Sequence, residues 1–82
     1  MVADDYTKKY GEEGAFKVKV LDGHGRALSG VSVSFNINGV FYNKISDSNG
    51  FARLNINLMP GKYIITSSYN RLFISNTVTV VP

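Results

Sequence analysis

Hydrophobic and polar residues alternate most strictly between residues 31 and 37. Because successive side chains of a β-strand point to opposite faces, this stretch predicts a strand with one apolar and one polar face. The apolar face takes Val31, Val33, Phe35 and Ile37. Asn38-Gly39 follows, and both residues tolerate the positive φ of a two-residue type I′ turn. The pattern therefore predicts a hairpin whose second strand covers residues 40–46.

Similar stretches recur along the rest of the chain, separated by turn residues rich in Gly, Asn, Asp and Pro. Strands are expected at 16–20, 51–58, 63–69 and 73–81. The residues expected to point inward are Phe16, Val18, Val20, Ala52, Leu54, Ile56, Leu58, Val78 and Val80. No segment has a helical period, and strands spaced about 8–12 residues apart are typical of a sandwich or barrel. The sequence predicts an all-β domain.

Residues 1–14 are more polar than the rest, with acidic and basic side chains around two tyrosines. The pattern is consistent with a short first strand over residues 5–10 and also with a polar lead-in. Residues 15–82 are expected to form the β-sandwich, which makes one domain in all.

Composition narrows the classes of protein and partner. Hydrophobic residues make up 44% of the 82 and charged residues 18%, a globular balance. The chain has no cysteine, so the core alone must stabilise the domain. The net charge of +3 comes from scattered Lys and Arg residues, which argues against nucleic acid as a partner. No apolar run approaches the ~20 residues of a membrane span, so no membrane insertion by this segment is expected.

Three stretches together resemble a known family. They are VLDGHGRALSGVSV at 20–33, DSNGFA at 47–52 and LMPGKY at 58–63. In order and spacing they are similar to the Ig-like repeats of bacterial and archaeal cell-surface adhesins, closest to those of methanogenic archaea. In that group an Asn-Gly hairpin and a last strand like SNTVTV, here residues 75–80, also recur. The chain more distantly resembles carboxypeptidase-regulatory-like and Cna-B-type modules, and the resemblance covers residues 15–81.

The resemblance implies an Ig-like β-sandwich of about six or seven antiparallel strands, with a related transthyretin-like strand order as the alternative. It implies a non-catalytic, extracellular repeat of a large cell-surface protein that spaces or presents binding regions, or contributes to adhesion. Its partners would be neighbouring repeats, surface glycans, or proteins of a host or partner cell. Two alternative functions are a carbohydrate-binding module and an accessory domain of a secreted hydrolase.

Aromatic residues are the candidates for function. Phe41, Tyr42 and Phe73 are ligand-facing candidates, because an outward ring can stack on a sugar or a neighbouring module. Only one of the adjacent Phe41 and Tyr42 can face inward. Tyr63 follows Pro60-Gly61 at the start of a strand, the place of a tyrosine corner, in which the hydroxyl bonds backbone a few residues upstream.

Groups for catalysis or metal binding are few. His24 is the only histidine, so neither histidine-based catalysis nor a multi-histidine metal site is expected, and no cofactor is expected either. Asp22, Asp47 and Asn49 offer oxygen ligands for calcium, although such residues commonly bond their own turn backbone. The Cna-B-type relatives suggest an isopeptide bond from Lys17 or Lys19 to Asn76, but alternation places both lysines outward.

Overall fold

A computed structural model describes all residues from Met1 to Pro82 and contains seven strands and no helix. The strands are β1 (Tyr6–Lys9), β2 (Ala15–Lys19), β3 (Ser32–Ile37), β4 (Val40–Ile45), β5 (Phe51–Asn55), β6 (Gly61–Tyr69) and β7 (Leu72–Val81). Each strand predicted from alternation is present. The strand expected at 51–58 ends earlier, at Asn55, so that Leu58 lies beyond it and is only half-buried.

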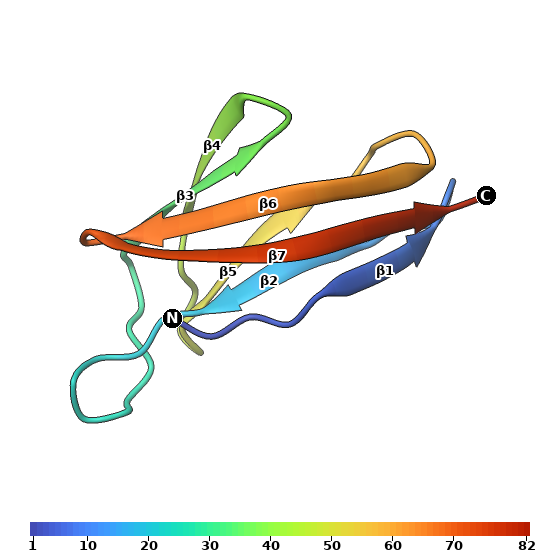
Figure 1. Cartoon of the computed structure of the whole chain (residues 1–82). Helices are drawn as coiled ribbons and strands as arrows, with labels where there is room; N and C mark the ends of the chain where they lie inside the picture. Colours follow the sequence, from blue (N-terminus) through green and yellow to red (C-terminus); the bar gives the residue numbers. More distant parts are fainter.

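The strands form two facing sheets, as Figure 1 shows. One has the order β1-β7-β6-β3-β4, and the other pairs β2 with β5. In an immunoglobulin domain, one sheet contains strands G, F, C and C′ in that order and the other contains strands B and E. Here β7, β6, β3 and β4 occupy the places of G, F, C and C′, and β2 and β5 those of B and E. The fold is therefore an Ig-like β-sandwich. All neighbouring strands run antiparallel except β1 and β7, which pair in parallel over Tyr6–Lys9 and Val78–Val81.

The core lies between the sheets and contains most of the residues that alternation places inward, together with Ile65 of β6, whose apolar neighbour Ile64 leaves the inward face of that strand undecided by pattern. Those buried are Phe16, Val18, Val20, Val33, Phe35, Ile37, Ala52, Leu54, Ile56, Ile65, Val78 and Val80. The rings of Phe16 and Phe35 meet edge to face across the two sheets, with centroids 6.2 Å apart. Such a contact adds stability beyond the area that the rings bury.

The β3–β4 turn has the backbone conformation that its sequence predicts. Asn38 has a φ of 53° and Gly39 a φ of 74°, so both central residues are in the left-handed region, as a type I′ turn requires. The register is fixed by this turn and pairs Ile37 with Val40 and Phe35 with Tyr42. The hairpin projects beyond the β2–β5 sheet (Figure 1).

Residues 6–9 form an edge strand of the five-stranded sheet. Of the two interpretations of residues 1–14, a short first strand or a polar lead-in, the structure shows the strand. Lys8 on this strand is buried, and its Nζ donates to the carbonyl oxygen of Ile56 at 2.6 Å. Its aliphatic stem packs inward beside Val80, and the ammonium group reaches the chain just beyond β5. This single side chain links the two sheets.

Candidate functional site

The outer surface of the five-stranded sheet carries a group of neutral side chains that we call the outer patch. Paired residues of neighbouring strands point to the same face, so the register assigns each side chain to a face. The outer patch consists of Ser32, Ser34, Asn36, Phe41, Asn43, Ile45, Ile64, Thr66, Ser68, Phe73, Ser75 and Thr77. None of these twelve side chains is charged at neutral pH. The charged residues on the same face of the sheet, Lys9 and Lys62, lie outside the patch, toward the end where β6 begins.

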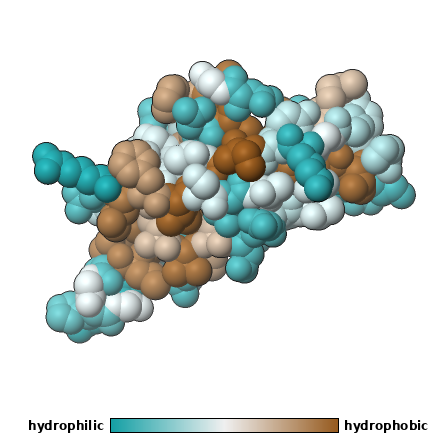
Figure 2. All heavy atoms as spheres, in the orientation of Figure 1, coloured by the Kyte–Doolittle hydropathy of each residue, from teal (hydrophilic) through white to brown (hydrophobic).

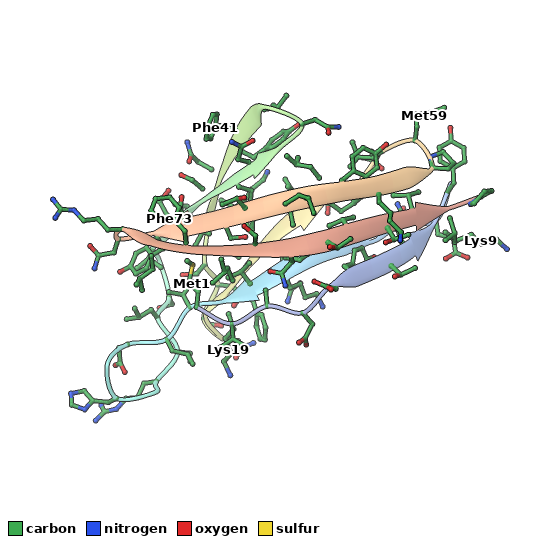
Figure 3. The ribbon with its side chains drawn as sticks, in the orientation of Figure 1. Met1, Lys9, Lys19, Phe41, Met59 and Phe73 are labelled. Atoms are coloured by element: carbon green, nitrogen blue, oxygen red, sulfur yellow. The ribbon has the colours of Figure 1, made fainter.

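Two of the three ligand-facing candidates lie on the outer patch. Phe41 and Phe73 are each 71% exposed and stand on different strands of the face, β4 and β7. Figure 3 shows Phe41 on the projecting hairpin and Phe73 beside the β6–β7 turn. Tyr42 points to the opposite side of the sheet but is still 40% exposed, because β4 extends beyond the second sheet. The structure thus brings Phe41 and Phe73 to one face and places Tyr42 on the other.

Hydroxyl and amide groups fill the space between the two phenylalanines. The Ser34 hydroxyl donates to Asn43 Oδ1 at 2.7 Å, and the hydroxyls of Thr66 and Ser75 lie 3.2 Å apart. Apolar atoms seen in Figure 2 gather toward the end where Figure 3 labels Phe73 and Met1, and more polar atoms lie beside them. The hydroxyl and amide groups can form hydrogen bonds with a ligand, and the exposed rings beside them can stack on it. This combination suits a sugar or a neutral protein surface.

The largest hollow, of about 580 Å³, lies elsewhere, between residues 2–6 and strand β2. Its lining combines the apolar side chains of Ala3, Tyr6 and Phe16 with charged residues of both signs. None of the aromatic ligand candidates borders it. The carboxylates here are not grouped with others, since no cluster of three or more His, Cys, Asp or Glu side chains is present in the structure.

Asp5 holds the segment before β1 against β7. Its Oδ1 accepts from the backbone N–H of Thr77 at 3.0 Å and from Asn76 Nδ2 at 3.3 Å. The Thr77 hydrogen bond, helped by that of Asn76, holds the pKa of the Asp5 carboxyl below its ordinary value. Asn76 also donates to the Ala3 carbonyl, while its own buried Oδ1 has no partner.

The candidates for an isopeptide bond are not brought together. Asn76 belongs to β7 and bonds Ala3 and Asp5, whereas Lys17 and Lys19 belong to β2 in the other sheet. Lys19 Nζ instead lies 5.6 Å from the centroid of the Phe51 ring, a cation–π contact.

The two turn aspartates bond their own backbone. Asp22 Oδ1 accepts from the N–H groups of His24 and Arg26, and Asp47 Oδ1 accepts from those of Asn49 and Phe51. The Phe51 N–H is the main cause that lowers the pKa of the Asp47 carboxyl, and Arg53, 3.4 Å away, adds to it. These oxygens serve as Asx-turn acceptors, as local turn chemistry predicts.

Tyr63 has the geometry of a tyrosine corner. Its hydroxyl donates to the carbonyl oxygen of Met59, four residues upstream, at 2.7 Å. The ring is partly buried and packs against the core cluster. The hydrogen bond closes the chain around Pro60-Gly61 just where β6 begins.

Tyr63→Phe is expected to lower the free energy of unfolding by about 1 kcal/mol, the net value of one hydrogen bond. The ring and its packing are retained, so only the bond to Met59 is lost. Urea denaturation measures the change, with Tyr10→Phe as a control, since Tyr10 is half-exposed and its hydroxyl has no hydrogen bond within the chain. Equal midpoints for Tyr63→Phe and wild type would contradict a stabilising corner.

Sequence reasoning missed two features of this region. It gave no role to Lys8 or Asp5 within the polar first 14 residues, whereas Lys8 links the sheets and Asp5 bonds β7. It also missed that every residue of β4 is exposed. The even separation of Tyr6 and Tyr10 suggests a shared face in a strand here, but Tyr10 is exposed and nothing local indicates which strand pairs with β1.

Comparison with family models, with curated proteins and with solved structures finds no match to this chain. Nor does the fold include any helix that has the length and apolar character needed to cross a membrane.

Proposed function

We propose that this chain is a non-catalytic, extracellular Ig-like module of a large cell-surface protein, of the adhesin-like kind that its sequence resembles. In this role it is a load-bearing spacer that holds binding regions away from the cell. The observation that carries the proposal is the parallel pairing of the first and last strands, β1 and β7. The resemblance of residues 15–81 supports the same role, with neighbouring modules as the immediate partners.

The ends of the chain suit tension along the long axis. Met1 and Pro82 lie toward opposite ends of a molecule that measures 40 × 22 × 17 Å (Figure 1). Because β1 and β7 are parallel, pulling on the two ends slides one strand along the other. The hydrogen bonds between them then share the load, instead of breaking one after another as they do when strands are peeled apart.

Further contacts fasten β1 at both of its ends. Before the strand, Asp5 accepts from Thr77, and after it the Tyr10 N–H donates to the Val81 carbonyl at 2.7 Å. Within the strand, Lys8 bonds the carbonyl oxygen of Ile56, the residue just beyond β5 of the other sheet. Extraction of β1 therefore requires the loss of contacts to both sheets, which favours a module that resists force.

Single-molecule pulling tests the proposal with two attachment geometries. The chain has no cysteine, so paired cysteine handles are unique. Asp4→Cys with Pro82→Cys loads β1 and β7 in shear, and Glu12→Cys with Pro82→Cys peels the same strands from their shared end. All three positions are exposed. We expect a several-fold higher rupture force for the first pair, and equal forces in the two geometries would overturn the load-bearing role.

A further inference from the structure

Strand β4 leaves one edge of the five-stranded sheet open. It is the last strand in the order β1-β7-β6-β3-β4, and all six of its residues are exposed. Natural edge strands are commonly protected by several charges, a proline or a bulge. Between Val40 and Ile45 the only charged residue is Lys44, and there is no proline.

The backbone groups on this open edge can be identified. The Ser46 N–H donates to the Val31 carbonyl, so residue 46 directs its backbone toward the β3 side. In an antiparallel pair this direction alternates with a period of two, and Lys44, Tyr42 and Val40 therefore also face β3. The N–H and C=O groups of Phe41, Asn43 and Ile45 are left pointing to the open side.

We propose that β4 pairs antiparallel with β4 of a second copy of this chain, with Asn43 opposite Asn43 at the two-fold axis. A two-fold interface must match itself, and this register does so on both faces. On the outer face, Phe41 of each copy lies opposite Ile45 of the other copy. On the inner face, Lys44 lies opposite the Tyr42 ring of the second copy, a cation–π arrangement. Every open backbone group of Phe41, Asn43 and Ile45 gains a partner.

Charge and packing disfavour the neighbouring registers. Centring the pair on Lys44 sets two ammonium groups directly opposite each other, which destabilises a strand pair. Centring it on Tyr42 places Ile45 opposite Gly39, so the isoleucine has no side chain to contact. The register centred on Asn43 separates the two lysines and uses all the exposed apolar side chains of the outer face of β4.

The resulting dimer joins two five-stranded sheets into one continuous sheet, with the neutral outer patches of both copies on the same side. A pair of six-residue strands is much smaller than the roughly 800 Å² per partner of a stable interface, so association is weak and depends on concentration. Many copies crowded at a surface would raise the local concentration and favour pairing. The pairing does not depend on the load-bearing role, because a single free domain in solution also shows it.

Cysteine cross-linking tests the register. The Cα atoms of a hydrogen-bonded antiparallel pair are about 5.5 Å apart, within the disulfide range of about 4.4–6.8 Å. Asn43→Cys is therefore expected to form a disulfide dimer rapidly under mild oxidation. Phe41→Cys is the matched control, since two copies of residue 41 are four positions out of register, about 13 Å apart. Mixed with Ile45→Cys, the Phe41→Cys chain is expected to form the heterodimer. Equal rates for Asn43→Cys and Phe41→Cys alone would overturn the register.

Sedimentation of the cysteine-free chain over rising concentration tests the dimer itself. The wild type is expected to shift from monomer toward dimer, and Asn43→Pro to remain monomeric at the same concentrations. Proline at position 43 removes an N–H that points to the open edge and the side-chain bond from Ser34, but no backbone bond of the β3–β4 ladder. Asn43→Thr keeps this N–H and is expected to dimerise like wild type. A wild-type chain that stays monomeric at millimolar concentration would refute the proposal, whatever the fold of the variants.

Discussion

Phe35→Ala is expected to lower the free energy of unfolding by about 3–5 kcal/mol, the usual cost of truncating a buried phenylalanine. Phe35 is fully buried on β3 and meets Phe16 of the facing sheet edge to face. Its loss removes apolar burial and leaves a cavity between the sheets. A domain of this size has only about 5–15 kcal/mol of total stability, so the loss is a large share of the free energy that holds the fold. Guanidinium or urea denaturation measures the change.

Phe41→Ala is the matched control, because the same side chain is truncated one strand away. Phe41 is largely exposed on the outer patch, and its truncation is expected to change stability by no more than about 0.5 kcal/mol. The measurement belongs at low micromolar concentration, where the proposed pairing of β4 is not expected to contribute. Comparable losses for Phe35→Ala and Phe41→Ala would mean that the projecting hairpin folds back onto the core. The contrast separates the aromatic residue that holds the fold from the one available to a partner.

The sequence could sort Phe35 from its neighbours but could not sort Phe41 from Tyr42. On β3, polar residues flank each apolar one, so the inward face is evident from alternation alone. On β4, the two adjacent aromatic residues point to opposite faces, so the local pattern does not indicate which of the two faces is buried. The reason lies in tertiary structure, because β4 is the edge strand of its sheet and neither ring is buried.

The first strand shows the same limit. Residues 6–9 are mostly polar, and their strand is defined by pairing with residues 78–81, at the far end of the chain. A buried lysine is also improbable from composition, since lysine is among the residues least often fully buried. Burial of Lys8 is tolerated because the backbone carbonyl of Ile56, just beyond β5, accepts its hydrogen bond. Only the folded chain brings that carbonyl within reach.

Gly50→Ala is expected to lower the free energy of unfolding by about 2–5 kcal/mol, from backbone strain and overpacking together. Gly50 has a φ of 82°, in the left-handed region that disfavours any side chain. A Cβ there would lie 2.9 Å from both the Val20 carbonyl oxygen and the Ala27 Cβ. Backbone cannot yield as a flexible side chain can, so the turn or the loop after β2 must move. Thermal and urea denaturation measure the loss.

Gly25→Ala isolates the strain from the overpacking. Gly25 has a similar φ of 79°, but a Cβ there would meet nothing within 4 Å, so about 1–2 kcal/mol is expected. A Gly50→Ala cost no larger than that of Gly25→Ala would mean that the turn is not pressed against the loop. The contact matters because the Gly50 carbonyl accepts from the Val20 N–H, and the Val20 carbonyl accepts from Leu28. The stretches 20–33 and 47–52, which carry the family resemblance, thus meet at Gly50, and the missing Cβ is what lets them pack together.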